Sequence, residues 1–224
     1  WQWRIPLQHR VGNGYVYASA YTDTETVHNT FLNNLESKPL TAPRTLSFTT
    51  GHRREFWKKN CVALGLAGGF LEPLESTSIQ LIQTGLLRFL ENFPTTRINE
   101  VAIAEYNRVT TNEYSRIRDF LILHYCTSKR DDNDLWRYCR AMTLPDELQH
   151  KVDMFVHTGR VPMLSEESYS EASWVAIFTG QGVIPSSYAT QTNFIDLATL
   201  KAGMDKRCQS IAKFVSTMPG HQEF

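Results

Sequence analysis

The sequence has few of the features that mark several common protein classes. Only four cysteines occur among its 224 residues, at Cys61, Cys126, Cys139 and Cys208, and no two of them form a CxxC pair. Such wide spacing is typical of free thiols in a reducing cytosol, and it favours neither a disulfide framework nor a zinc site. We therefore expect a cytoplasmic protein without a bound metal.

A net charge is also missing, because 23 Lys and Arg residues balance 23 Asp and Glu residues. A balanced chain lacks the basic footprint of nucleic-acid binding, so no nucleic-acid partner is expected. No apolar run approaches the roughly 18 residues that a membrane helix needs, and no signal peptide is visible, so no membrane partner is expected. The first residues, WQWRIP, lie inside a strand pattern without an initiator Met, which predicts that the chain is part of a longer one.

Three catalytic motifs are absent as well. Neither Gly12-Asn13-Gly14 nor GLAGG at 65–69 completes the GxGxxG of a dinucleotide-binding turn. No GxSxG is present, which excludes the usual hydrolase nucleophile elbow. The seven histidines include no HxxxH pair, which argues against a zinc site.

The residues that are present predict a mixed α and β fold, with short antiparallel strands followed by a mainly helical region. Apolar and polar residues alternate over residues 1–11, as in a half-buried strand. Gly12-Asn13-Gly14 supplies turn residues, so residues 1–21 are predicted to form a β-hairpin. Residues 46–50 are a further strand candidate, followed by a turn at Gly51.

Helical periodicity dominates the rest of the chain. Thr24 is expected to cap a short helix, Pro145 lies in the first turn of another, and Gly159 ends it. Apolar residues recur at helical spacing in three further ranges, 79–93, 98–126 and 200–215. These patterns predict one continuous domain fragment with three regions: a β-rich part over 1–64, a site loop and helix over 65–93, and a helical region over 94–224.

Several aromatic residues and one histidine have two interpretations. Four aromatic residues could form a wall over a flat substrate, although core packing is the commoner fate of such side chains; they are Tyr169, Trp174, Phe178 and Tyr188. His124 falls on the apolar stripe of the helix over 98–126, so we expect it to be a core residue and not a ligand.

The segment Val62 to Gln83 concentrates the residues with chemical potential. Small residues lead to the carboxylates Glu72 and Glu75, and then to the hydroxyl cluster Ser76, Thr77 and Ser78 before an apolar helix begins. Hydroxyl side chains at this place are helix-capping signals. Amides that the cap leaves free, together with the helix dipole, would suit an anion. The segment therefore predicts either a well-capped helix after a glycine-rich loop, or an anion site beside a carboxylate.

Two stretches resemble the signatures of one enzyme family, the flavin-dependent tryptophan halogenases. WQWRIP at 1–6 is similar to the family's WxWxIP, and GLAGGFLEPLESTSI at 65–79 is similar to its second signature, in the same order. Weaker similarity continues through HYCTSKRDDNDLW at 124–136 and SWVAIFTGQGVIP at 173–185. Most of the chain thus resembles the C-terminal portion of such an enzyme, which has an FAD-dependent monooxygenase-like fold.

The resemblance implies a reaction and a set of residue roles. Reduced FAD, oxygen and chloride or bromide would generate hypohalous acid, which passes through a tunnel to an electron-rich, indole-like arene. A flavin reductase would supply the reduced cofactor, and a homodimer is one alternative for the oligomeric state. By this resemblance the roles are as follows: Glu75 and Ser76 catalytic, Thr77 and Ser78 halide-binding, Leu66 and Ile79 flavin contacts, Trp1 and Trp3 along the tunnel.

The sequence departs from the family in three places. Ser78 stands where tryptophan halogenases carry Gly, the residues that clamp free tryptophan do not align, and the family's GxGxxG segment and catalytic lysine would precede Trp1. Glu72, which precedes a proline, is expected to orient the loop. The alternatives are a related flavin monooxygenase, in which the helix start only holds flavin, and a noncatalytic helical module that binds a partner.

Overall fold

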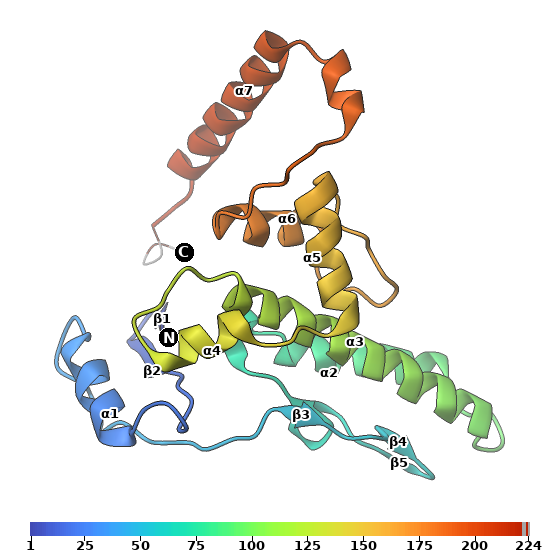
Figure 1. The fold of residues 1–224 in the computed structure, drawn as a ribbon. Coiled ribbons are helices and arrows are strands. Elements are labelled where there is room, and N and C mark those ends of the chain that lie inside the picture. Colours follow the sequence, from blue (N-terminus) through green and yellow to red (C-terminus); the bar gives the residue numbers. More distant parts are fainter. Residues whose placement is uncertain (221–222, 224) are drawn as a thin grey trace. The chain divides into compact units, whose positions relative to one another are not determined.

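A computed structural model describes residues 1–220 and 223 of the chain (Figure 1). Its contacts divide the chain into two compact units. The first unit comprises Trp1–Thr45 and Tyr188–Phe224, and the second comprises Leu46–Ser187. Within the described residues, no helix is both long enough and apolar enough to cross a membrane.

The first unit begins with the predicted hairpin, but its turn lies elsewhere. Strands β1 (Gln2–Pro6) and β2 (Val11–Tyr15) pair antiparallel with Trp3 opposite Gly14. The chain reverses where the Leu7 amide donates to the Arg10 carbonyl at 2.8 Å, so the predicted turn at Gly12-Asn13-Gly14 is wrong. These glycines belong to β2 because the Trp3 ring lies over them: a Cβ on Gly14 would approach it to 2.2 Å.

Two helices and a short 3₁₀ segment complete the first unit: α1 (Thr24–Asn33), η3 (Thr190–Phe194) and α7 (Leu197–Ser216). The predicted cap of α1 is displaced by one residue, since Asp23 accepts from the Thr26 amide and Thr24 is the first helical residue. The apolar strand face that the alternation predicts is only partly buried, because Ile5 is 52% exposed. The closing helix is confirmed as α7.

The second unit contains two short strand pairs, two 3₁₀ turns and five helices among its residues. The pairs are β3 (Gly51–His52) with β6 (Gly69–Phe70), and β4 (Trp57–Lys58) with β5 (Cys61–Val62). The turns are η1 (Gly65–Ala67) and η2 (Pro73–Glu75). The helices are α2 (Ser78–Glu91), α3 (Glu100–Cys126), α4 (Asp134–Ala141), α5 (Asp146–Thr158) and α6 (Glu171–Gly180).

One strand prediction in this unit is wrong. Residues 46–50 form no strand, and pairing begins at Gly51, where a turn was expected. The reason is the available partner: Gly51 and His52 pair with Phe70 and Gly69, and the pairing does not extend toward residue 46. The predicted regional boundaries at 64 and 93 stay a prediction.

Helix α3 contributes residues to both apolar clusters of the second unit. Its residues Tyr106, Ile117 and Leu121 pack with Phe56 and Trp57 in the first cluster. The second cluster consists of Phe120, Leu123, Leu148, Phe155, Val161, Trp174 and Phe178. Trp174 and Phe178 are fully buried, which confirms core packing for these two of the four aromatic residues considered above.

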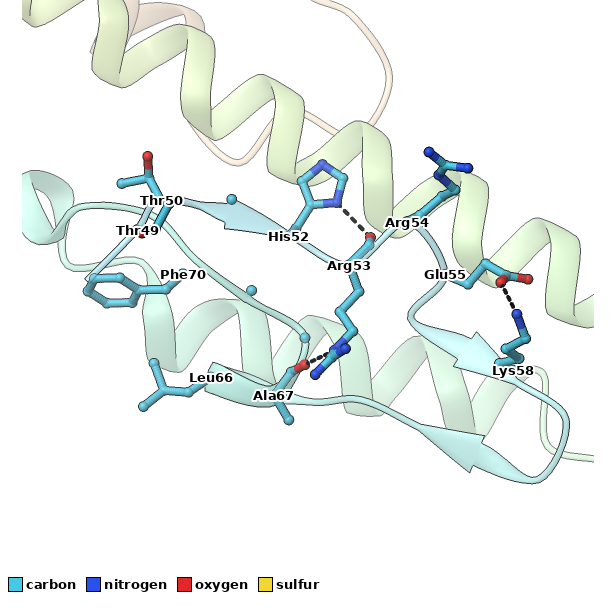
Figure 2. A pocket seen from close by; sticks show the side chains of 13 residues that line it. Thr49, Thr50, His52, Arg53, Arg54, Glu55, Lys58, Leu66, Ala67 and Phe70 are labelled. Atoms are coloured by element: carbon cyan, nitrogen blue, oxygen red, sulfur yellow. Dashed lines mark hydrogen bonds and ion pairs between the residues drawn. The ribbon is translucent and has the colours of Figure 1, made fainter. Parts of the chain in front are cut away.

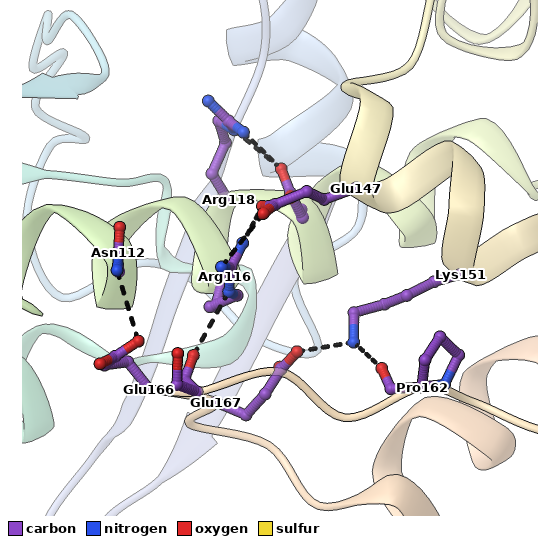
Figure 3. A network of polar contacts seen from close by, with 10 residues as sticks. Asn112, Arg116, Arg118, Glu147, Lys151, Pro162, Glu166 and Glu167 are labelled. Atoms are coloured by element: carbon purple, nitrogen blue, oxygen red, sulfur yellow. Dashed lines mark hydrogen bonds and ion pairs between the residues drawn. The ribbon is translucent and has the colours of Figure 1, made fainter.

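Ion pairs attach α5 and the segment after it to α3 (Figure 3). Arg116 of α3 pairs with Glu147 of α5. Lys151 of α5 is 1% exposed; its Nζ lies 2.7 Å from Glu167 Oε1 and also donates to the Pro162 carbonyl. A buried lysine needs such partners to offset its desolvation, so the pair fixes how the 160–167 segment runs past α5.

Candidate functional site

The predicted site segment follows a tightly packed path through η1, β6 and η2 to the start of α2. Gly65 has a φ of 58°, in the left-handed region that favours glycine. At Gly69, a Cβ would lie 2.7 Å from the His52 Cβ and 2.8 Å from the Gly51 carbonyl oxygen. The glycines therefore allow the backbones of β3 and β6 to approach closely.

The hydroxyl cluster does not cap α2, contrary to the capping prediction. Thr77 occupies the N-cap position, but its side chain accepts no hydrogen bond from the helix. Capping requires an extended backbone that aims the side chain at the first-turn amides. Thr77 instead has helical angles, with φ −78° and ψ −6°. The preceding residue, Ser76, is left-handed with φ 54° and ψ 35°.

The start of α2 therefore presents first-turn amides that no cap side chain engages. The positive end of the helix dipole lies at the same place. Thr77 is buried, Ser78 is half-buried and Ser76 is exposed, so the three hydroxyl residues differ sharply in surroundings. Such a turn can hold a small anion through backbone N–H groups.

Glu75 lies at the end of η2, immediately before this turn, and contacts α3. Its Oε1 is 2.9 Å from Nε2 of His124. The other ring nitrogen of His124, Nδ1, donates to the Phe120 carbonyl at 2.8 Å. His124 is largely enclosed, as expected for a core residue, but it also contacts Glu75, which the sequence did not predict. No local pattern could have revealed the pair, because its members lie far apart in the sequence and meet only through the packing of α3 against η2.

Tyr169 is a second residue near Glu75. The sequence did not predict that it lies there. Its ring stacks on Phe120 with centroids 3.8 Å apart. Burial raises the pKa of the Tyr169 phenol, and the Glu75 carboxylate raises it further. Its hydroxyl oxygen is buried and has no hydrogen-bond partner within the described part of the chain. The phenol is therefore a neutral group beside the carboxylate.

Glu72 has a structural contact, as its expected role requires. Its Oε2 accepts from the Tyr125 hydroxyl at 2.9 Å. The Tyr125 ring stacks on Trp136 with centroids 5.6 Å apart, and the Arg130 guanidinium lies 4.6 Å above that indole. This chain of contacts ties the loop before η2 to α3 and α4.

The two predicted flavin contacts are exposed apolar side chains, with Leu66 78% and Ile79 70% exposed. Leu66 lines a cavity of about 660 Å³ together with Ala67, Gly68 and Gly69, whereas Ile79 does not line it (Figure 2). Arg53 reaches across this cavity and donates from Nε to the Ala67 carbonyl at 2.8 Å. Polar and charged side chains, among them Arg53, Arg54 and Lys58, line the rest of the cavity, and the flavin contacts stay a prediction.

The remaining predicted site residues, Trp1 and Trp3, belong to the first unit, whereas the rest belong to the second. Both tryptophans are half-buried. Their place along a tunnel stays a prediction. Within the residues that the structure describes, no three His, Cys, Asp or Glu side chains gather as a metal site would require.

Comparison with known proteins gives concordant results. The tryptophan halogenase family model matches residues 1–196. Among curated proteins, the tryptophan 7-halogenase KtzQ of Kutzneria sp. (strain 744) is 30% identical over 203 residues, which make up 83% of this chain and 38% of that protein. The chain thus spans about two fifths of the length of this relative.

Solved structures of two flavin-dependent halogenases match the whole chain. Xcc4156 from Xanthomonas campestris superposes with a TM-score of 0.95 at 46% identity, over 100% of this chain and 45% of that one. BrvH from Brevundimonas sp. BAL3 gives a TM-score of 0.94 at 41% identity, over 100% of this chain and 46% of that one. The predicted fold class, short antiparallel strands followed by helices in the C-terminal part of such a fold, is confirmed.

Proposed function

The chain belongs to the tryptophan halogenase family, and on that premise we propose that it is the C-terminal portion of a flavin-dependent halogenase. The complete enzyme would use reduced FAD, oxygen and chloride or bromide to halogenate an electron-rich, indole-like arene. A flavin reductase would supply the reduced cofactor, and a homodimer is one alternative for the assembly.

The observation that carries this proposal is the position of Glu75. Its carboxylate lies directly before the turn into α2, where the cap side chain leaves the first amides unengaged. A halide held by the backbone of Thr77 and Ser78 would meet the positive end of the helix dipole, which is worth roughly 0.3 to 1 kcal/mol per charge at exposed sites. Since the contact is through backbone, Ser78 can serve in place of the family's Gly.

Each remaining residue would have a distinct task. Bound flavin supplies the oxygen chemistry that converts halide to hypohalous acid, and Leu66 and Ile79 would hold its ring. Trp1 and Trp3 would keep the arene away from the flavin. Glu75 would stabilise the ring as it becomes cationic, because a carboxylate in an enclosed site interacts strongly with developing positive charge. Ser76 would present its hydroxyl beside that carboxylate, at the left-handed turn into α2.

Glu75→Gln in the full-length protein tests the proposal. With reduced FAD, bromide and indole, we expect the wild type to form bromoindole and the variant to form it at least about 100-fold more slowly, because a charge-stabilising group is lost. Oxidation of reduced flavin should continue at the wild-type rate. Glu91→Gln, at the exposed far end of α2, is the matched control and should brominate normally.

Two results would contradict the proposal. Hydroxylated product without a halide requirement would identify a flavin monooxygenase, in which the helix start only holds flavin. Absence of flavin uptake by the full-length protein would favour the binding module. Bromination by Glu75→Gln at the wild-type rate would contradict the role given to Glu75, but not the assignment of the protein as a halogenase.

A further inference from the structure

His124 is placed to act on Glu75 from the last turn of α3. The two side chains meet at 2.9 Å, between Nε2 of His124 and Oε1 of Glu75. His124 is the more enclosed of the two, with 14% of its side chain exposed against 31% for Glu75. The rings of Phe120 and His124 pack edge to face, with centroids 4.9 Å apart and planes at 84°. The imidazole is therefore held by Phe120 as well as by Glu75.

The hydrogen bonds of His124 fix where its protons lie. The Phe120 carbonyl oxygen can only accept, so Nδ1 of His124, 2.8 Å away, carries a hydrogen. In a neutral imidazole the other nitrogen, Nε2, would then be an acceptor facing a carboxylate acceptor. A contact of 2.9 Å therefore requires a proton between Nε2 and Glu75 Oε1.

The end of helix α3 and the Tyr169 phenol form the surroundings of this contact. His124 lies in the last turn of α3, where the helix dipole stabilises a cation. The neighbouring Tyr169 phenol is neutral and does not compete for the carboxylate as a charge. Within the described residues, the ion pair that includes Glu75 is its contact with His124. The His124 side chain is thus placed to fix the direction of the Glu75 carboxylate.

We propose that His124 is a positioning residue for the halogenation reaction, which holds Oε1 of Glu75 and leaves Oε2 for the arene. The inference rests on the proposed function. As the ring π electrons bond the halogen of hypohalous acid, the oxygen–halogen bond breaks and its electron pair goes to oxygen. The ring proton then passes to Oε2 of Glu75, and the C–H electron pair restores the aromatic ring. The contact with His124 Nε2 keeps the Glu75 carboxylate oriented until that proton arrives.

Kinetics of His124→Gln in the full-length enzyme test the positioning role, with indole and bromide as probes. Gln can still donate an N–H but carries no charge. We expect kcat for bromination to fall about 10- to 100-fold through misplacement of the carboxylate. The KM for indole should stay within about threefold, and flavin oxidation should be unchanged, because the change affects the transition state and not binding. His124→Ala, which removes the donor as well, should lose more.

His157→Gln is the matched control. His157 also lies in the last turn of a helix, α5, and its Nδ1 donates to the Asp153 carbonyl at 2.8 Å, but it is exposed and no ion pair of the described residues includes it. This variant should brominate as the wild type does. The double variant Glu75→Gln/His124→Gln should be no more than about twofold slower than Glu75→Gln, because the two residues act as one unit. Full-rate bromination by His124→Gln, or additive losses in the double variant, would overturn the proposal.

A readout independent of product separates this inference from the proposed function. In the full-length enzyme labelled with ¹⁵N-histidine, we expect the His124 signal to show both ring nitrogens protonated. Glu75→Gln should remove the proton from one of them, whereas Glu91→Gln should not. An unchanged His124 signal in Glu75→Gln would overturn the proposal. If the wild type forms no halogenated product, the proposed function fails while this spectrum still decides the pairing.

Discussion

Ser76 and Thr77 link Glu75 to α2, and their backbone angles decide what the turn can do. Left-handed angles cost a non-glycine residue roughly 1 to 2 kcal/mol. The turn therefore stores strain between a carboxylate and a helix start, and strained backbone is often concentrated at functional sites. The same geometry turns the Thr77 hydroxyl away from capping, so the amides stay free for another acceptor.

Tyr114 gives a residue-scale prediction about pH. Burial, and to a lesser extent the nearby Glu113 carboxylate, raises the pKa of the Tyr114 phenol to about 12. In the unfolded chain that pKa is about 10, so the unfolded state loses the proton first. The stability contribution is complete below about pH 10 and is lost as the pH rises through about 12.

Tyr114→Phe should therefore flatten the alkaline loss of stability. We expect the free energy of unfolding of the wild type to fall by about 1 to 3 kcal/mol more than that of the variant between roughly pH 10 and 12. Urea unfolding of both full-length proteins at the two pH values measures this difference. Equal losses in the two proteins would show that Tyr114 does not contribute.

Sequence reasoning at the residue scale proposed a role for Glu75, which stays a prediction, but did not predict its contact with His124. The second family signature located Glu75 through a local motif, whereas His124 looked like any polar residue on an apolar helix stripe. The capping prediction was wrong because hydroxyl residues before a helix indicate a cap only if the backbone there is extended. Likewise, Gly12 and Gly14 resembled turn residues because the sequence cannot show that Trp3 packs over them.

At the element scale, α2 is held against α3 by a buried polar cluster. Arg88 Nη2 of α2 lies 3.1 Å from Glu113 Oε2 of α3, and the side chains are 14% and 5% exposed. Thr84 donates to the same carboxylate oxygen at 3.0 Å, and Arg88 donates to Thr110 at 2.8 Å. Because the candidate site lies at the start of α2, this cluster also positions the site.

Glu113→Ala should strongly destabilise the protein, because it leaves the Arg88 charge buried without its partner. We expect a loss of about 3 to 5 kcal/mol in the free energy of unfolding, measured by urea titration. The double variant Arg88→Leu/Glu113→Leu should recover most of that loss. Glu105→Ala, which breaks an exposed pair with Arg108, should cost far less than Glu113→Ala. A small loss in Glu113→Ala would contradict the role given to the cluster.

Helices were more predictable than strands in this chain. The helices α2, α3, α5 and α7 followed from apolar residues at helical spacing and from Pro and Gly at their ends. The strand pairs of the second unit involve only two residues on each side, too short for alternation to be recognised. Residues 46–49 alternate apolar and polar side chains, yet pairing forms only at Gly51–His52, where Phe70 and Gly69 supply a partner.

At the scale of the whole molecule, the candidate site residues are divided between two units. Glu75, Thr77 and Ser78 lie in the second unit, and Trp1 and Trp3 lie in the first. The two family signatures thus come from different units, which explains why periodicity alone could not connect them. The family and the fold class were accessible from these motifs, whereas the pairing of Glu75 with His124 required coordinates, and the location of the site stays a prediction.

The proposed halogenase function depends most directly on a halide bound at the start of α2, beside Glu75. The decisive measurement is a crystal of the full-length protein soaked in bromide, with data collected at the bromine absorption edge. An anomalous peak within hydrogen-bond reach of the Thr77 and Ser78 amides is the predicted result. A wild-type crystal that shows bromide elsewhere but none at these amides would contradict it.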